Sequence, residues 1–363
     1  MMLDSDYSPA ELILFGLTGK SLSNETQRII EREKAALFIL FSHNYESKDQ
    51  LIGLTDEIQS RVQIFSPCLP AIISADQEGG KVQRFRAGFT PLPDAERVGA
   101  LNTPSLAFEL ARIQAKELYA SGIQINFAPV CDINTKPTNP VIGSRAFGCD
   151  VELVTRMASA VVRGHLSEGV EPCIKHFPGH GDTELDSHNS LPTVSTALAT
   201  LRSREWIPFH RAMKSGCNFV MSAHLLLPHL DPLHASSFSQ IFLRDFLRGE
   251  LMYQGVVVSD DMEMGAVVQT YGKEEAPVLA LQAGCDLLCY RSELEGLIAL
   301  EAIKKALTDK TLDSSRVTES IDRVRKVRAG LKLARNTLSI HERLEQIGHT
   351  DHLQFVEQHF STP

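Results

Sequence analysis

The segment VEPCIKHFPGHGDTELDSH, residues 170–188, joins a short apolar run to a stretch that is dense in reactive side chains. Its last fourteen residues, 175–188, contain one Lys, three His, two Asp, two Gly and one Pro. Neither a buried core nor a solvated helix face requires imidazoles, carboxylates and turn residues together. The segment therefore predicts a strand followed by a loop that builds an active site at the end of that strand.

Short apolar runs of this kind recur along the chain, separated by longer amphipathic stretches. Eight of them have the near-continuous hydrophobic character of buried parallel strands: residues 12–15, 36–41, 69–74, 123–130, 170–174, 218–222, 255–259 and 285–289. A helical pattern lies over residues 103–122, with Thr103 as the N-cap, Pro104 in the first turn and Gly122 as the stop. Eight strands alternating with helices predict an α/β fold of the (β/α)8 TIM-barrel type. A doubly wound open sheet is the alternative, although no G-x-G-x-x-G follows an early strand.

The end of the chain differs from the rest. We expect the catalytic barrel domain to cover residues 1–335, with its last helices over residues 293–307 and 315–333. Residues 336–363 form a C-terminal helical extension or tail, which is polar and contains four His residues. A partly ordered segment or a surface helix explains this composition better than a metal site does.

Composition and charge restrict the partners of the chain. A net charge of -9 and the lack of a Lys/Arg cluster argue against nucleic acid and membrane surfaces, and favour a small neutral or anionic substrate. No segment approaches the ~20 apolar residues of a membrane span, and the N-terminal sequence lacks the positive charge of a signal peptide. Seven cysteines without paired spacing indicate free thiols and a cytoplasmic location. Low aromatic content and an acidic surface are compatible with a monomer.

Polar residues follow separate predicted strands at the point where each strand ends. Asp76 follows LPAIISA, Lys175 follows EPCI, His224 follows NFVMSA and Asp260 follows GVVVS. Arg145 lies in NPVIGSRAFG, after the fourth predicted strand. Because the C-terminal ends of barrel strands meet at one mouth, a single site accounts for all of these residues.

Asp260 follows the strongly β-prone run GVVVS, so we expect its carboxylate to lie inside the mouth and Asp261 to point elsewhere by strand alternation. Such a carboxylate could be a metal ligand, a general base or a nucleophile. Five side chains would be available as further metal ligands: His176, His180, Asp182, His188 and His224. The chain has no H-E-x-x-H motif and no H-x-H at the end of the first strand, so a metal-dependent barrel hydrolase ranks second.

The preferred chemistry is nucleophilic displacement at the anomeric carbon of a sugar, which needs a carboxylate on one face of the ring and a proton donor on the other. Asp186 and His188 are two residues apart, so on an extended segment their side chains face the same way. The carboxylate could hold one imidazole nitrogen while the other meets the leaving oxygen, and an imidazole pKa near ~6.5 suits proton transfer at neutral pH. The alternative is that His188 only caps a turn.

Five motifs together resemble the family 3 glycoside hydrolases of the single-domain bacterial β-N-acetylhexosaminidase type, which recycle cell-wall muropeptides. The motifs are DQEGGKVQRF (76–85), FAPVCDIN (127–134), NPVIGSRAFG (139–148), KHFPGHGDTELDSH (175–188) and SDDMEMGA (259–266). The resemblance covers most of residues 10–335 and leaves the tail outside. It implies a muropeptide substrate, N-acetylglucosaminyl anhydro-muramyl peptide, and we expect no cofactor and no metal ion.

The resemblance also implies residue roles. Asp260 would be the nucleophile of a retaining exo-β-N-acetylglucosaminidase that forms a covalent glycosyl-enzyme, and His188, oriented by Asp186, would act as acid and then as base. The residues implied to hold the terminal N-acetylglucosamine are Asp76, Arg84, Arg145, Lys175 and His176. A phosphorylase is the mechanistic rival, because a His in place of a carboxylic acid removes a charge that repels phosphate. A sugar-sensing protein without catalysis is the third interpretation.

Backbone geometry after the fifth predicted strand is a further expectation. Lys175 and His176 are adjacent, so both can reach one sugar only if the backbone over residues 175–178 is distorted or cis. About twenty residues with little regular pattern then precede the next helix. We expect them to form a lid that carries the His-Asp dyad and brings His188 toward Asp260 when sugar binds.

Overall fold

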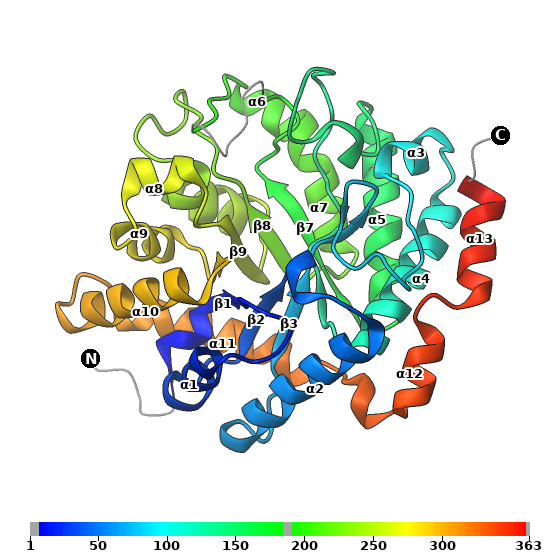
Figure 1. Ribbon diagram of the computed structural model, residues 1–363. Helices are drawn as coiled ribbons and strands as arrows, with labels where there is room; N and C mark the ends of the chain where they lie inside the picture. Colours follow the sequence, from blue (N-terminus) through cyan, green and yellow to red (C-terminus); the bar gives the residue numbers. More distant parts are fainter. Residues whose placement is uncertain (1–6, 184–190, 361–363) are drawn as a thin grey trace.

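The computed structural model describes residues 7–183 and 191–360, which form a closed barrel of parallel strands wrapped in helices (Figure 1). Hydrogen-bonded neighbours follow the order β1-β10-β9-β8-β7-β6-β3-β2 around the barrel. Its strands are β1 (Ile13–Gly16), β2 (Leu37–Leu40), β3 (Ile72–Ala75), β6 (Ile125–Asn126), β7 (Glu171–Phe177), β8 (Phe219–Ser222), β9 (Val256–Asp261) and β10 (Leu287–Tyr290). The predicted (β/α)8 barrel is therefore confirmed, and the open-sheet alternative is wrong.

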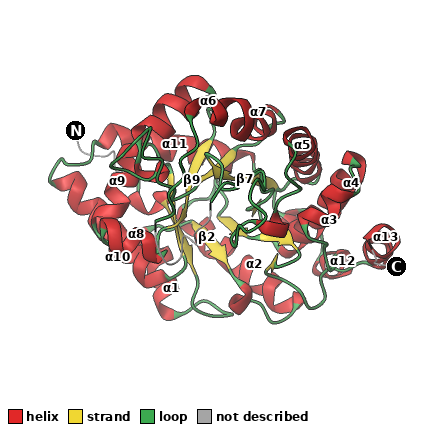
Figure 2. Cartoon of the chain, turned by 90° about the horizontal axis from the view of Figure 1, so that it is seen from above, coloured by secondary structure: helices red, strands yellow, loops and turns green. Residues whose placement is uncertain are grey.

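Helices surround the ring of strands on all sides, as the view from above shows (Figure 2). They are α1 (Asn24–Glu33), α2 (Lys48–Phe65), α3 (Ala95–Ala100), α4 (Pro104–Ser121), α5 (Val151–Ser167), α6 (Leu198–Thr200), α7 (Trp206–Lys214), α8 (Gly265–Tyr271), α9 (Glu275–Ala283), α10 (Glu293–Thr308), α11 (Ser314–Gly330), α12 (Ile340–Gln346) and α13 (Thr350–Phe360). Within the described part of the chain, no helix is both long and apolar enough to cross a bilayer.

The strands form because their side chains are apolar on both faces. Every residue of β1, β2, β3, β8 and β10 is buried, between the barrel interior and the surrounding helices. The helix predicted over residues 103–122 begins and ends where its sequence signals indicate. Thr103 is its N-cap, and the chain leaves α4 at Gly122, whose φ of 85° lies in the left-handed region that glycine tolerates.

One predicted strand is much shorter in the structure. The apolar run over residues 123–130 contributes only Ile125–Asn126 to the barrel as β6. Pro129 has no N–H to donate to the ladder, which explains why regular pairing stops before it. Pairing with β7 resumes only at Val130, which forms an isolated parallel bridge to Lys175.

The predicted C-terminal helical extension is present. It consists of α12 and α13, which lie on the outside of the barrel next to α4 (Figure 1). α12 begins with a capping box in which Ser339 and Glu342 satisfy each other's backbone N–H groups. The division into a barrel over residues 1–335 and a tail over residues 336–363 stays a prediction.

Candidate active site

A cavity of about 430 Å³ opens at the mouth where the barrel strands end. Six of the residues predicted from the sequence line it: Asp76, Arg84, Arg145, Lys175, His176 and Asp260. The two residues of the predicted dyad, Asp186 and His188, lie outside the described residues, as does the part of the predicted lid over residues 184–190. The structure thus brings together the described residues that were predicted as nucleophile or sugar ligands, whereas His224, which was also predicted for the mouth, does not line this cavity.

The strand order explains why distant segments meet in this cavity. Asp76 follows β3 directly, and the chain then turns through a small antiparallel hairpin, β4 (Gln77–Gly79) and β5 (Val82–Gln83), which ends just before Arg84. Lys175 and His176 lie within the last residues of β7. Because all barrel strands are parallel, these ends face one mouth.

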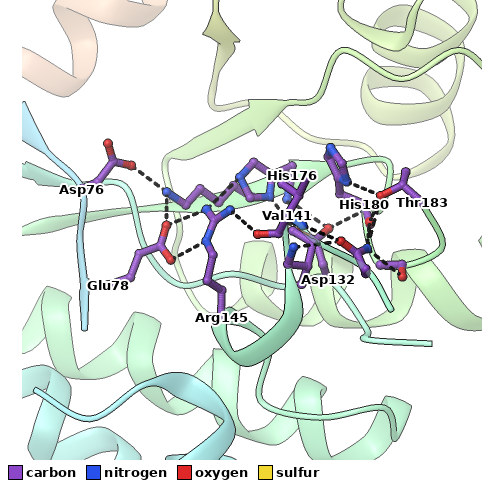
Figure 3. Close-up of polar contacts among 12 residues, drawn as sticks. Asp76, Glu78, Asp132, Val141, Arg145, His176, His180 and Thr183 are labelled. Carbon is purple, nitrogen blue, oxygen red and sulfur yellow. Dashed lines mark hydrogen bonds and ion pairs between the residues drawn. The ribbon is translucent and has the colours of Figure 1, made fainter. Parts of the chain in front are cut away.

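Five charged side chains form one ion cluster beside the cavity: Asp76, Glu78, Arg84, Arg145 and Lys175. All of them except Glu78 line the cavity, and Figure 3 shows how Asp76, Glu78 and Arg145 lie. The buried Lys175 Nζ lies 2.7 Å from Asp76 Oδ1 and 2.6 Å from Glu78 Oε1. Arg84 donates to the other Asp76 oxygen at 2.9 Å. Arg145 forms a bidentate ion pair with Glu78, in which its Nε lies 2.9 Å from Oε2 and a terminal nitrogen lies 2.8 Å from Oε1.

The cluster fixes the charge state of its members. Burial alone would raise the pKa of Asp76, but Lys175 and Arg84 outweigh it and hold that pKa well below its usual range. Burial likewise opposes ionisation of Glu78, yet Arg145 and Lys175 lower its pKa to about 2. Burial would lower the pKa of Lys175, and the two carboxylates raise it instead. All five groups are therefore charged at neutral pH, and they form a set of donors and acceptors fixed in place for polar groups of a ligand.

His176 is held by a second buried carboxylate (Figure 3). Its Nδ1 lies 2.7 Å from Asp132 Oδ2, and the backbone N–H groups of His176 and His180 donate to the same carboxylate. Burial opposes the ionisation of Asp132, but His176 keeps its pKa low. Arg145 can only donate, and it reaches His176 Nε2 at 3.3 Å, so its partners assign the ring proton to Nδ1.

The backbone across residues 175–178 is irregular, as predicted. The Lys175–His176 and Phe177–Pro178 peptide bonds are cis, and the pairing of β7 with β8 shifts register between Ile174 and Phe177. Lys175 and His176 both line the cavity, although they are adjacent in a strand.

Asp260 lies at the end of β9 and lines the same cavity. Its Oδ1 accepts the backbone N–H of Asp261 at 2.8 Å. Burial acts to raise the pKa of Asp260, but the nearby imidazoles of His176 and His224 and the amino group of Lys175 hold it below its ordinary value. The carboxylate is therefore ionised at neutral pH, the state that a nucleophile needs.

The expectation that Asp261 points away from the site is wrong. Its side chain also lines the cavity, where it pairs with Arg291 at 2.5 Å. Burial raises the pKa of Asp261 to about 7, while Arg291 acts against the rise. Adjacent carboxylates at the end of β9 thus differ in protonation behaviour, with Asp260 the more acidic.

Two of the described side chains proposed as metal ligands have other contacts. Asp182 accepts the hydroxyl groups of Thr135 and Thr196 at 2.9 and 2.7 Å. The buried His224 stacks on Phe238, with ring centroids 5.6 Å apart. Among residues 7–183 and 191–360, no three His, Cys, Asp or Glu side chains gather in an arrangement suited to a metal ion.

Two carboxylates of the site, Glu78 and Asp132, were not among the predicted site residues. Glu78 is two positions after Asp76 in DQEGG, and Asp132 lies two positions beyond the fourth predicted strand in FAPVCDIN. The strand-end rule that selected Asp76 would also have selected Asp132. Nothing in the sequence signals that Glu78 pairs with Arg145, which is 67 residues away.

A third buried carboxyl, Glu205, lies behind the loop that follows β7. A Cβ atom on Gly179 of that loop would lie 3.0 Å from Glu205 Oε2, and Arg204 binds the other oxygen at 2.5 Å. Burial raises the pKa of Glu205 from 4.5 to about 7, against the effect of Arg204. Between about pH 4.5 and about pH 7, the folded protein therefore keeps a proton on Glu205 that the unfolded chain has released.

The free energy of unfolding should therefore fall as pH rises from about 4.5 to about 7. Glu205→Gln is expected to flatten this fall by up to about 3 kcal/mol, because the amide does not titrate. Urea unfolding of both proteins at about pH 5 and about pH 8 measures the difference. An identical pH dependence in the two proteins would contradict the assignment.

Comparison with known proteins places this chain in a family. The model for the Glycosyl hydrolase family 3 N terminal domain matches residues 9–327. A β-hexosaminidase from Alkalilimnicola ehrlichii is 37% identical over 305 residues, which cover 82% of this chain and 84% of that protein.

Solved structures agree with this match. A glycoside hydrolase family 3 β-N-acetylglucosaminidase from Paenibacillus sp. superimposes with a TM-score of 0.92 at 36% identity, and the match covers 98% of this chain and 68% of that chain. It therefore includes part of the C-terminal extension, which the sequence motifs do not reach. NagZ from Neisseria gonorrhoeae, in complex with N-trifluoroacetyl-D-glucosamine, gives a TM-score of 0.81 at 28% identity over 97% of this chain and 98% of that chain. The chain belongs to family 3 of the glycoside hydrolases.

Proposed function

We propose that the protein is a retaining exo-β-N-acetylglucosaminidase that removes terminal N-acetylglucosamine from muropeptides, the N-acetylglucosaminyl anhydro-muramyl peptides. The observation that carries the proposal is that the ionised Asp260 shares one cavity with the ion cluster around Lys175. The names of the relatives, β-hexosaminidase and β-N-acetylglucosaminidase, support this class of sugar.

In this proposal Asp260 attacks the anomeric carbon, and the bond from that carbon to the leaving oxygen breaks. His188, oriented by Asp186, gives a proton to the leaving oxygen, so the aglycone departs as an alcohol. His188 then takes a proton from water, whose oxygen attacks the anomeric carbon and frees Asp260. Two inversions give N-acetylglucosamine with the configuration of the substrate.

The ion cluster would bind the sugar that is displaced. Asp76 and His176 Nε2 accept hydrogen bonds from sugar hydroxyls, while the three cationic binding residues donate: Arg84, Arg145 and Lys175. Because these groups already hold one another in place, little side-chain entropy is lost when the sugar binds. Contacts that shorten as the ring distorts toward the oxocarbenium-like state lower the barrier to reaction.

The setting of the enzyme is also a proposal. Five of its seven cysteines are buried thiols and none of the seven is in a disulfide, which supports a reducing cytoplasm. There a monomeric enzyme would act on imported fragments of the cell wall.

The test is release of nitrophenol from its β-N-acetylglucosaminide, first in phosphate-free buffer and then with added phosphate. Free N-acetylglucosamine under both conditions is the expected result. A sugar phosphate formed only with added phosphate would replace the hydrolase by a phosphorylase. Loss of activity in a chelator would favour the metal-dependent alternative, and no turnover at all would leave the sugar-sensing protein. Hydrolysis of a purified muropeptide then tests the natural substrate.

A further inference from the structure

A buried carboxylate joins the C-terminal helices to the loop that begins with Arg84. Glu117 lies in α4 and is 3% exposed. From the loop, Thr90 donates its backbone N–H to Glu117 at 3.0 Å and its hydroxyl at 2.5 Å. From the C-terminal helices, Gly348 donates its backbone N–H at 3.0 Å, and His352 Nδ1 lies 2.9 Å away. Glu117 therefore connects two segments that do not follow each other in the chain.

The loop is in turn tied to the hairpin that carries the sugar site. Gln83, in β5, donates its side-chain amide to the carbonyl of Thr90 at 2.9 Å and accepts the backbone N–H of Leu92 at 3.1 Å. The next residue is Arg84, which binds Asp76 at 2.9 Å. Hydrogen bonds thus link the C-terminal helices to Gln83, and the peptide bond to Arg84 links Gln83 to the ion cluster.

A second contact lies beside the first. Gly348, in the turn between α12 and α13, has a φ of +66°, and a Cβ atom there would lie 2.1 Å from the carbonyl oxygen of Gly88. Lys48 of α2 donates to the carbonyl oxygens of Ile347 and, at 3.4 Å, Leu344. The turn therefore rests directly on the loop of residues 84–94, and Lys48 of α2, which lies against both segments, holds it by hydrogen bonds.

The far end of the chain is fixed as well. Arg97 of α3 donates to the carbonyl oxygen of Phe360, the last residue of α13, whose ring is buried. α12 and α13 run along the outer side of α4, and α3 lies at the upper end of α13 (Figure 1). The two helices thus contact the loop of residues 84–94 at its middle and the helix that follows it.

We infer that α12, α13 and the turn between them, residues 340–360, act as a C-terminal brace that sets the position of Arg84 and so the affinity for the terminal sugar. Glu117 and His352 are positioning residues in this assignment, since neither lines the cavity. The inference rests on the proposed function, because Arg84 acts there on the sugar. A brace that only covered apolar surface would need no buried carboxylate shared with the loop.

The test begins with His352→Ala, which removes a contact of the brace to Glu117. KM for the nitrophenyl β-N-acetylglucosaminide should rise roughly 3- to 10-fold with kcat little changed, because Arg84 holds the sugar in the ground state and the transition state alike. His352→Asn, whose amide nitrogen can replace Nδ1, should restore KM. The matched control is His341→Ala, because His341 is exposed on α12 and pairs with the exposed Glu345.

Thr90→Val provides an independent variant, since it removes the hydroxyl contact at the other side of Glu117 while keeping the shape of the side chain. Each variant is then combined with Arg84→Ala, and thermal unfolding is followed in parallel. If the brace acts through Arg84, the rise in KM disappears in the Arg84→Ala background while any loss of thermal stability remains.

The same fold-rise in both backgrounds, or an unchanged KM in His352→Ala and Thr90→Val, would overturn the brace. These outcomes differ from failure of the proposed function, in which the wild-type protein itself releases no nitrophenol.

Discussion

Replacing Asp260 with asparagine is expected to lower kcat for the nitrophenyl β-N-acetylglucosaminide by at least about 10³-fold. An amide has the size of the carboxylate and keeps an oxygen for the backbone N–H of Asp261, so the fold should be retained. It lacks the negative charge that attacks the anomeric carbon and that faces the developing positive charge of the sugar ring. Steady-state kinetics with equal amounts of folded protein, checked by circular dichroism, measure the loss.

The neighbouring carboxyl provides the control. Asp261→Asn changes a group at the end of the same strand that lines the same cavity but pairs with Arg291. Its effect on kcat should be far smaller, because the Asp261 carboxyl is engaged by Arg291 and its raised pKa leaves it only partly ionised at neutral pH. Comparable losses of kcat in the two variants would show that negative charge in the cavity, rather than attack by Asp260, accounts for catalysis.

Chemical rescue separates attack from electrostatic stabilisation more sharply. In Asp260→Gly, azide has room to take the place of the carboxylate and to attack the anomeric carbon itself. One inversion then gives an α-glycosyl azide, whereas the wild-type protein passes through two inversions. Rescue without this product would assign the nucleophile to another group.

The fold could be predicted because its signal is local. Each barrel strand is a short apolar run that can be identified from its own residues, without knowing which strands it pairs with. The parallel arrangement then places the strand ends together. Asp76, Lys175 and Asp260 were predicted for the site on that basis, and all three line the cavity. The family resemblance added Arg84, and it gave His176, which was until then a candidate metal ligand, a role in binding the sugar.

The sequence could not reveal contacts that depend on distant segments. Glu78 meets Arg145, and Asp132 meets His176, only because the barrel closes. The two contacts of the C-terminal brace with Glu117 join residues more than two hundred positions apart. Such pairs have no local pattern, so a single sequence does not indicate them.

The orientation of Asp261 was wrong for a related reason. Strand alternation assumes a regular ladder, but the pairing of β9 with β10 shifts register between Leu287 and Cys289, and Asp261 pairs with Cys289 at that irregularity. The side chains of Asp260 and Asp261 therefore do not follow simple alternation at the strand end.

Lys175→Met is expected to lower both stability and activity. Lys175 is buried between Asp76 and Glu78, and removing it leaves two buried carboxylates with only Arg84 and Arg145 to balance them. Loss of one partner from a buried ion pair costs about 3–5 kcal/mol, and the two remaining guanidinium groups favour the lower end of this range. A misplaced Asp76 should also reduce kcat/KM roughly 10²-fold.

The pH dependence of the free energy of unfolding shows whether unbalanced charge causes the loss of stability in Lys175→Met. In the wild-type protein the pKa values of Asp76 and Glu78 are lowered, to about 2 for Glu78, so their contribution to stability is present above about pH 4.5 and is lost as pH falls through the folded values. Without Lys175 both carboxyl groups should protonate at higher pH. The stability difference between wild type and variant should therefore be largest at neutral pH and shrink below about pH 4.

Urea unfolding across this pH range tests the argument, with Lys20→Met as the control. Lys20 forms an exposed pair with Glu46, where solvent screens both charges, so its loss should change stability little at any pH. A deficit in Lys175→Met that stays constant with pH would instead indicate that lost packing of the aliphatic stem, and not the uncompensated carboxylates, destabilises the variant. In that case the ion cluster would contribute to the affinity for sugar, but the balance of charge within it would not contribute to the stability of the barrel.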